Sequence, residues 1–303
     1  MVNLSVGVIG AGAVGCFYAA QMAKKGAQVT IITRHPEDYD ETINIQSVHG
    51  NFLFKPVAIQ SIHEPAVVPF DVVLLATKAL PIIDQVALVQ PFMSKNTKLM
   101  VIQNGIFIES DLLDAFSQPI FRCLAFICVS RKSKNLIHHM DFGSLSIGCL
   151  NGQLASYIND PFFELLRQLE ISVRFTSDIH QAIWEKLIWN APFNPLSVVY
   201  NGATTEQLLN DPAIASRIQL IMKEVQKLAA IAGHGISDKF IQKKIDQTRQ
   251  MVPYKTSMCL DHEAGLPIES EAILGNVIQF AQYKSIDVPE ILTLYQDLQK
   301  LTV

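Results

Sequence analysis

The first part of the chain alternates between apolar runs and glycine-rich or polar breaks. Residues 4–9 form a short apolar run, residues 10–15 carry three glycines in the spacing G-x-G-x-x-G, and residues 14–25 have helix-forming character. A short continuous apolar run is typical of a strand buried in a parallel sheet, and Gly26 stands where a glycine commonly ends a helix. The pattern predicts a strand, a glycine turn and a helix.

The same segment has a second interpretation. Residues 4–23 come close to the roughly 20 mainly apolar residues that a membrane helix needs, and no charge precedes Lys24. A secretory signal, however, needs a positively charged start, and glycines at this density weaken a helix. We therefore expect the opening of a nucleotide-binding fold here, rather than a membrane or export segment.

Three further apolar runs extend the expected sheet. Residues 28–34, 70–78 and 98–105 are apolar, and each ends in polar residues, as parallel strands do when loops follow their carboxyl ends. Lys78 and Asn104 stand at two of these ends. Taken singly, each is either a functional residue or a solvated or capping loop residue.

The second half of the chain changes character. Residues 144–148 and 171–176 are the last strand candidates, and the later pattern is helical with short breaks at prolines and glycines. We expect an α/β protein, with an N-terminal Rossmann-type parallel-sheet domain over residues 1–172 and a mostly α-helical C-terminal domain over residues 173–303.

Composition narrows the class of protein. The 303 residues, 49% of them hydrophobic, suffice for two domains, and a net charge of −4 favours neither nucleic acid nor an anionic membrane as partner. The five cysteines are odd in number and lack C-x-x-C spacing, which argues against a disulfide framework and a zinc site. We expect a cytoplasmic location and no metal.

The glycine motif stands in the strand, turn and helix context that dinucleotide binding requires. Its first glycine permits the tight turn, its second lets backbone N–H groups approach a pyrophosphate, and its third lets the helix pack on the strand. The helix N-terminus offers further N–H groups to the phosphates. The expected cofactor contacts in this loop are Gly10, Ala11, Gly12, Ala13, Val14 and Gly15.

The end of the second expected strand bears on the choice of cofactor. An Asp or Glu there would accept hydrogen bonds from a ribose 2′-OH, whereas an Arg would pair with a 2′-phosphate. This chain has Thr33 and Arg34 at that point. We favour NADPH over NADH, the alternative being that Arg34 is a solvated residue at a strand end.

The first helix of the second domain carries a polar stripe. Residues 179–194 place Lys186, Asn190 and Asn194 four residues apart, so a continuous helix sets them along one side. The stripe either lines a cleft or faces solvent. Pro192 removes a backbone donor and clashes with the preceding turn, so we expect the helix to kink or end there.

Several blocks of the sequence carry a resemblance to a known family. They read "TKAL", "QNGI", "WEKLIWNAPFNPLS", "TSMCLDHEAGLPIES" and "GNVIQFAQYKSIDVP", and they are more specific than the glycine motif. Over nearly its whole length the chain resembles the ketopantoate reductases, NADPH-dependent enzymes that reduce 2-dehydropantoate to pantoate in pantothenate biosynthesis. The resemblance implies that Lys186 donates a proton to the carbonyl being reduced.

The resemblance also implies contacts for the remaining candidates. The implied substrate contacts are Lys186, Asn190, Asn194, Ser257 and Asn104. The implied cofactor contacts outside the glycine loop and Arg34 are Lys78, Asn104, Ser130 and Glu269.

The chain departs from the family pattern at three places. A further substrate-binding asparagine of some members aligns with Thr204, with Asn201 nearby, and the usual "TEID" around the glutamate is "IESE" at residues 268–271. Pro192 also intrudes between Asn190 and Asn194. These departures bear on substrate contacts more than on the fold or the cofactor.

The chemistry of these side chains fits reduction of a ketone. Hydride delivery builds negative charge on the ketone oxygen, and a nearby ammonium group can stabilise that charge and supply the proton. Asparagines are neutral partners for a carboxylate and a hydroxyl. We expect a small 2-keto acid as substrate, held between the two domains, and the family allows a homodimer. The alternatives are a paralogue that reduces another branched 2-keto acid and a non-enzymatic protein that senses NADP(H).

Overall fold

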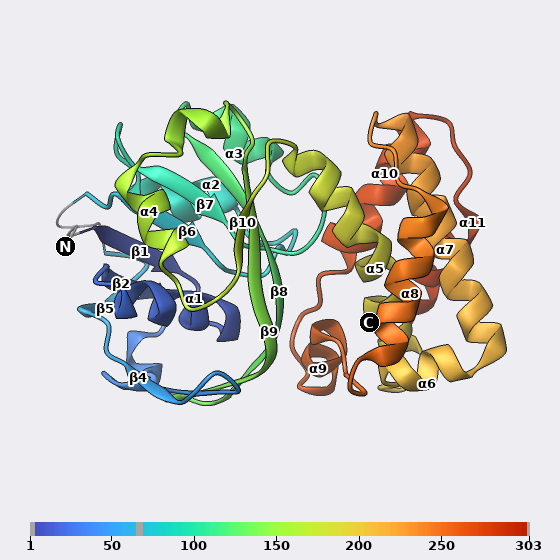
Figure 1. Ribbon diagram of the computed structural model, residues 1–303, viewed down its shortest axis with the longest axis horizontal. Coiled ribbons are helices and arrows are strands. Elements are labelled where there is room, and N and C mark those ends of the chain that lie inside the picture. Colours follow the sequence, from blue (N-terminus) through green and yellow to red (C-terminus); the bar gives the residue numbers. More distant parts are fainter. Residues whose placement is uncertain (1–3, 65–68, 302–303) are drawn as a thin grey trace. The chain divides into compact units, whose positions relative to one another are not determined.

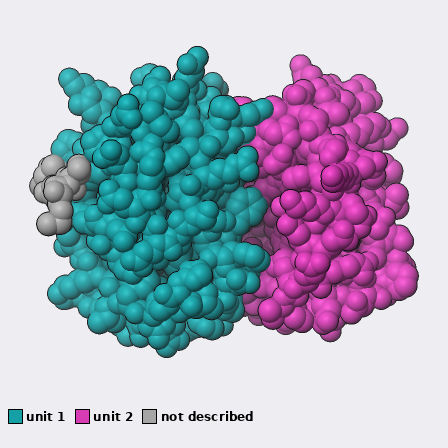
Figure 2. All heavy atoms as spheres, in the orientation of Figure 1, with its two compact units in different colours: residues 1–77, 83–103, 109–179 teal, residues 78–82, 104–108, 180–303 magenta. Residues whose placement is uncertain are grey.

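The computed structural model describes residues 4–64 and 69–301. The chain divides into two compact units, coloured separately in Figure 2. Unit 1 comprises Met1–Thr77, Ile83–Gln103 and Glu109–Ile179, and unit 2 comprises Lys78–Ile82, Asn104–Ile108 and His180–Val303. Unit 1 extends to Ile179 rather than to residue 172 because a short strand, Val173–Phe175, pairs within its sheet.

Unit 1 is built on one mixed sheet (Figure 1). Its strands are β1 (Ser5–Ile9), β2 (Gln28–Thr33), β3 (Ile43–Ser47), β4 (Phe52–Phe54), β5 (Ala58–Ser61), β6 (Val72–Leu75), β7 (Lys98–Val101), β8 (Ile120–Ser133), β9 (Leu136–Cys149) and β10 (Val173–Phe175). They lie in the order β4-β3-β9-β8-β7-β6-β1-β2-β5, and β10 also pairs with β9. The parallel run from β5 through β1 to β8 is the expected Rossmann-type sheet.

The helices of unit 1 cover this sheet. They are α1 (Ala13–Lys24), α2 (Gln85–Val89), α3 (Ser110–Ala115) and α4 (Pro161–Arg167), with 3-10 turns η1 (Pro36–Asp38), η2 (Gln90–Phe92) and η3 (Leu154–Tyr157). Side chains of α1 and α4 share one core cluster with alternate residues of the central strands, among them Val6 and Val8. The strand, glycine turn and helix expected at residues 4–25 are therefore confirmed.

The hairpin of β8 and β9 was not predicted from the sequence. The two strands pair antiparallel from Phe121 and Cys149 to Ser133 and Leu136, with register shifts at three places. Each shift moves the side chains that follow to the other face of the strand, so no simple alternation of apolar and polar residues survives. The short strands β3, β4 and β5 were missed as well.

Unit 2 is helical. It contains α5 (Ile179–Val199, which starts on the last residue of unit 1), α6 (Thr205–Asn210), α7 (Pro212–Ile231), α8 (Asp238–Gln250), α9 (Ser257–Glu263), the π-helical turn η4 (Glu271–Gly275), α10 (Asn276–Tyr283) and α11 (Pro289–Gln299). Across residues 4–64 and 69–301, every helix is too short or too polar to cross a membrane.

The longest helix corrects one expectation. α5 runs through both Pro192 and Pro195 to Val199, so it does not end at Pro192. Each proline leaves one carbonyl of the preceding turn without its usual N–H donor, at a cost that packing must offset. Every residue from Ala191 to Val198 is buried, and this burial keeps the segment helical.

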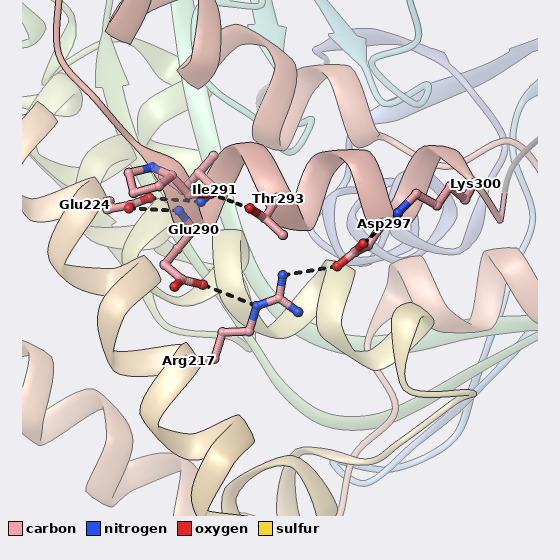
Figure 3. A network of polar contacts seen from close by, with 8 residues as sticks. Arg217, Glu224, Glu290, Ile291, Thr293, Asp297 and Lys300 are labelled. Carbon is pink, nitrogen blue, oxygen red and sulfur yellow. Dashed lines mark hydrogen bonds and ion pairs between the residues drawn. The ribbon is translucent and has the colours of Figure 1, made fainter.

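The start of α11 is fixed by a side chain from α7 (Figure 3). The residue that precedes α11, Val288, has no side chain that could cap the helix. Glu224 instead accepts hydrogen bonds from the backbone N–H groups of Glu290 and Ile291, at 2.9 and 2.8 Å. These are the first N–H groups of a helix, which have no partner within it, so Glu224 ties α7 to α11.

Candidate active site

The polar stripe of α5 is largely buried. Asn190 is 6% exposed and Asn194 is 3% exposed, and Lys186 is half-buried. The interpretation of a stripe facing solvent is therefore wrong for the two asparagines. Buried amides need hydrogen-bonding partners, so burying these two side chains costs folding free energy unless such partners are present.

Lys186 is connected to a second segment of unit 2. Its Nζ donates a hydrogen bond to Oδ1 of Asn104 at 3.0 Å, and Nδ2 of Asn104 donates to Oε2 of Glu269 at 3.1 Å. An ammonium can only donate and an ionised carboxylate can only accept, so the two partners fix which way the amide points. Three residues far apart in the sequence thus form one polar chain.

A glycine lets Asn104 reach this position. Gly105 has a φ of +103°, and a Cβ there would lie 2.5 Å from the carbonyl oxygen of Ala272 in η4. The backbone N–H of Ile106 donates to the same oxygen at 3.0 Å, and Asn276 donates from Nδ2 to the carbonyl of Ile106 at 2.7 Å. Turns of π-helix are frequent at functional sites, and this one holds the Asn104 segment.

Glu269 contacts the segment that follows β6, and Lys78 lies in that segment. The backbone N–H of Ala79 donates to Oε1 of Glu269 at 3.0 Å. Lys78 donates to the carbonyl of Pro267 at 2.9 Å and pairs with Asp261 at 2.8 Å. Burial raises the pKa of Asp261, although the ion pair with Lys78 opposes that shift.

Ser257 and Asn194 are linked through buried hydroxyl groups. Ser257 is the exposed first residue of α9, and Thr256 before it caps the helix by accepting the N–H of Cys259 at 3.2 Å. The hydroxyls of Thr256 and Ser197 lie 2.5 Å apart, and Ser197 donates to the carbonyl of Asn194 at 2.8 Å. Both hydroxyl residues are fully buried, so α9 and α5 are held in fixed register.

The glycine turn lies in unit 1, between β1 and α1. Gly10 has a φ of +104° and a Cβ there would lie 2.7 Å from the backbone of Ala76, while a Cβ on Gly15 would lie 2.2 Å from the carbonyl oxygen of Gly10. These two glycines are required by the tight turn and by the close packing of α1. Gly12 differs, because a Cβ there would meet nothing within 4 Å.

The rest of the loop forms the start of α1. Gly12 is the N-cap and has no side chain that could accept hydrogen bonds from the N–H groups of the first turn. Ala11 is buried, and Ala13 and Val14 are half-buried. This end of α1 is suited to an anionic group.

The other two cofactor candidates also lie in unit 1. Arg34 is exposed and follows the last residue of β2, where the sequence predicted it. Ser130 lies on β8, and its hydroxyl oxygen is buried without a hydrogen-bond partner in the described part of the chain.

Thr204, which aligns with a further substrate-binding asparagine of some family members, caps a helix in this structure. Thr204 caps α6 and takes part in a capping box with Gln207, and Asn201 is exposed with a φ of +54°. Sequence reasoning missed Asp261, Ser197 and Thr256 as partners of candidate residues. The first and last lie inside the quoted block "TSMCLDHEAGLPIES", but only the fold shows what they contact.

Comparison with known proteins identifies one family along nearly the whole chain. The family model described as "Ketopantoate reductase PanE/ApbA" matches residues 6–152, and its C-terminal counterpart matches residues 178–302. A 2-dehydropantoate 2-reductase of Nostoc sp. is 32% identical over 97% of this chain and 94% of its own length.

Solved structures give the same result. The 2-dehydropantoate 2-reductase of Methylococcus capsulatus is 34% identical, covers 98% of this chain and 96% of its own, and superposes with a TM-score of 0.87. That of Geobacter metallireducens is 27% identical, covers 98% and 99%, and has a TM-score of 0.91. The chain therefore belongs to the ketopantoate reductase family.

Proposed function

We propose that this protein is an NADPH-dependent 2-dehydropantoate 2-reductase, which reduces the C2 ketone of 2-dehydropantoate to the hydroxyl of pantoate. Its family consists of pyridine-nucleotide-dependent reductases that act on a keto acid and hydroxy acid pair. The observation that carries the proposal is the hydrogen-bonded chain from Lys186 through Asn104 to Glu269.

Lys186 is the proton donor in this proposal. Reduction turns the ketone oxygen into an alkoxide, and a half-buried ammonium both stabilises that charge and provides the proton. Asn104 accepts a hydrogen bond from Nζ of Lys186 and so orients the ammonium group toward the proposed substrate oxygen. Lys186 is also a substrate contact.

Neutral side chains hold the rest of the substrate. Asn190 and Asn194 stand one and two turns after Lys186 on α5, and Ser257 is tied to the same helix through Thr256 and Ser197. Amides and a hydroxyl provide donors for the carboxylate of a 2-keto acid and acceptors for a hydroxyl. Asn104 is the further substrate contact.

The residues of unit 1 fit a pyridine nucleotide. The open space at Gly12 and the uncapped first turn of α1 suit a pyrophosphate, and Arg34 suits a 2′-phosphate. When bound, the reduced nicotinamide supplies the hydride. Ser130 of unit 1 contributes a further proposed contact through its backbone. The proposed cofactor contacts from unit 2 are Lys78 and Glu269.

A substrate panel tests the proposal. The loss of NADPH absorbance is followed with 2-dehydropantoate and with trimethylpyruvate, which has the same branched carbon skeleton but lacks the hydroxyl. We expect kcat/KM to favour 2-dehydropantoate by roughly tenfold or more, because buried polar groups are left unpaired by the analogue. Equal values would favour a reductase of another branched 2-keto acid. NADPH binding without turnover of any keto acid would favour a sensor.

A further inference from the structure

An arginine of unit 1 that the proposed function does not use lies against the glycine turn. Arg131 is on β8, close to the turn into β9. Its Nη2 donates to the carbonyl oxygen of Ala11 at 2.7 Å and to Sγ of Cys16 at 2.9 Å. The thiol of Cys16 also donates to the carbonyl of Ala11, at 3.4 Å. One guanidinium therefore contacts both the turn and the first turns of α1.

The other side of the guanidinium is equally constrained. Nη1 of Arg131 donates to the carbonyls of Lys134 and Ser133 at 2.6 and 3.2 Å. The guanidinium carbon lies 4.8 Å from the ring centroid of Tyr39, in the segment that follows β2. These contacts hold the planar group in one orientation.

The bond to Ala11 has a consequence for the next residue. The C=O of Ala11 and the N–H of Gly12 belong to one peptide group, and in a trans peptide they point to opposite sides. No cis peptide occurs in the described part of the chain. A carbonyl held toward Arg131 therefore turns the N–H of Gly12 away from Arg131. The turn is open at Gly12, where an added Cβ would meet nothing within 4 Å.

The next peptide is fixed from the helix. The N–H of Cys16 donates to the carbonyl of Gly12 at 3.0 Å, which is the first bond of α1.

Burial raises the pKa of the Cys16 thiol, while the charge of Arg131 opposes the shift. The thiol is thus protonated at neutral pH and able to donate to Ala11.

We propose that Arg131 is a positioning residue for the cofactor: through the Ala11 carbonyl it holds the Gly12 N–H in the direction that receives the cofactor pyrophosphate. The proposal rests on the proposed function, because it presumes that a pyridine nucleotide binds to this turn. Without Arg131 the Ala11 carbonyl loses the bond at 2.7 Å and is held by the Cys16 thiol at 3.4 Å, so its peptide is held less firmly. A carbonyl oxygen that turned toward the phosphates would repel them.

The experiment compares cofactor affinities by fluorescence titration. Arg131→Met keeps the length of the side chain and removes its donors. We expect the Kd of both NADPH and NADH to rise by the same factor, roughly tenfold, because both carry the pyrophosphate and a charge-assisted hydrogen bond is lost. Arg131→Lys should restore part of the affinity, since an ammonium can still donate to Ala11. Arg174→Met, at an exposed arginine of β10 in the same unit, is the matched control and should leave both affinities unchanged.

Each outcome separates the two proposals. A native protein that binds neither nucleotide overturns the proposed function and this inference with it. If the native protein binds both nucleotides and Arg131→Met binds them with unchanged affinity, the inference alone is overturned. A loss of affinity for NADPH but not for NADH also overturns it, because Arg131 would then contact the 2′-phosphate. Hydrogen exchange of the Gly12 amide should become faster in Arg131→Met. A global destabilisation would instead lower the Tm and speed exchange throughout the protein, not at this turn alone.

A second variant covers the case in which Arg131→Met does not fold. Cys16→Ala removes the second partner of Nη2 and the thiol bond to Ala11 while leaving Arg131 in place. It should weaken NADPH and NADH equally, by roughly two- to fivefold, as expected for a weaker neutral hydrogen bond. Native affinities in a folded Cys16→Ala protein would overturn the inference.

Discussion

Lys186 and Glu269 are joined by a single amide side chain, that of Asn104, with hydrogen bonds of 3.0 and 3.1 Å. An ammonium at one end and a carboxylate at the other polarise the amide in the same direction. Opposite charges that share one neutral connector stabilise each other without forming a direct ion pair. The orientation of the proposed proton donor is therefore set by a residue 82 positions away in the sequence.

Removing the amine of Lys186 should abolish most turnover and little else. Lys186→Ala is expected to fold and to bind NADPH with native affinity, while kcat falls by about 10² to 10⁴, the range typical of general acid catalysis. Lys186→Arg should restore little, because a guanidinium hardly gives up a proton near neutral pH. Single-turnover hydride transfer, with Kd and Tm measured beside it, checks this. Lys239→Ala, at an exposed lysine of α8, is the control, and native transfer in Lys186→Ala would rule out Lys186 as the acid.

Asn104 should be sensitive to charge more than to size. Asn104→Asp keeps the shape and the acceptor for Lys186, but it places a second carboxylate against Glu269, and like charges at hydrogen-bonding distance repel. We expect Asn104→Asp to lower kcat/KM at neutral pH at least as much as Asn104→Ala does. Steady-state kinetics of both variants checks the order, and an Asp variant with native kcat/KM would contradict the charged chain described here.

The segment 104–108 should not tolerate a side chain at its second position. In Gly105→Ala the new methyl group would lie 2.5 Å from the carbonyl oxygen of Ala272, at a φ of +103°. Strain at such positions costs on the order of 1–3 kcal/mol, so we expect a lower Tm together with a loss of kcat, because Asn104 is displaced. Gly233→Ala is the matched control, since it also has positive φ but no atom lies within 4 Å of its Cβ. If both variants lose stability but only Gly105→Ala loses kcat, the close approach is needed for the site.

The contacts that Asn104, Gly105 and Glu269 make could not be predicted from the sequence. The glycine spacing predicted the turn before α1, and the four-residue spacing correctly placed Lys186 and Asn190 on one helix, because both patterns are local. The bond between Asn104 and Glu269 spans 165 residues, and no periodicity reports on such a distance. Gly105 was part of the quoted block "QNGI", but the need for glycine there depends on Ala272 in a π-helical turn. The continuation of α5 beyond Pro192 depends in the same way on burial, which the local pattern does not show.

Arg34 should make the protein bind NADPH more tightly than NADH. If its guanidinium pairs with the 2′-phosphate, Arg34→Ala should weaken NADPH binding by roughly tenfold or more and leave NADH binding close to native. Fluorescence titration of both cofactors measures this directly. The pattern differs from that expected for Arg131, where both cofactors lose affinity together. Equal affinity for NADH and NADPH in the native protein would contradict the assignment.

The ion pairs that join α7 and α11 should make part of the stability depend on pH (Figure 3). Asp297 accepts hydrogen bonds from Arg217 at 3.2 Å and from Lys300 at 3.1 Å. Burial alone would raise the pKa of Asp297, but the bonds from Lys300 and Arg217 outweigh burial and hold that pKa below its ordinary value of 3.8. A carboxyl whose pKa is lower in the folded state stabilises the protein above its unfolded pKa and loses that effect as pH falls through the folded pKa.

Asp297→Asn should therefore reduce stability near pH 7 and have little effect in acid. Because the side chain is 29% exposed and Lys300 is 73% exposed, solvent screening limits the loss to about 1 kcal/mol or less, which is roughly 2–4 °C in Tm. The difference from the native protein should shrink as the pH falls below 3.8 through the folded pKa of Asp297, and it should also shrink in high salt. Asp287→Asn, at an exposed aspartate before α11, is the control. Thermal melting of the native protein and both variants at pH 7 and in acid measures the effect, and a difference that grows as the pH falls would show that the sign is wrong.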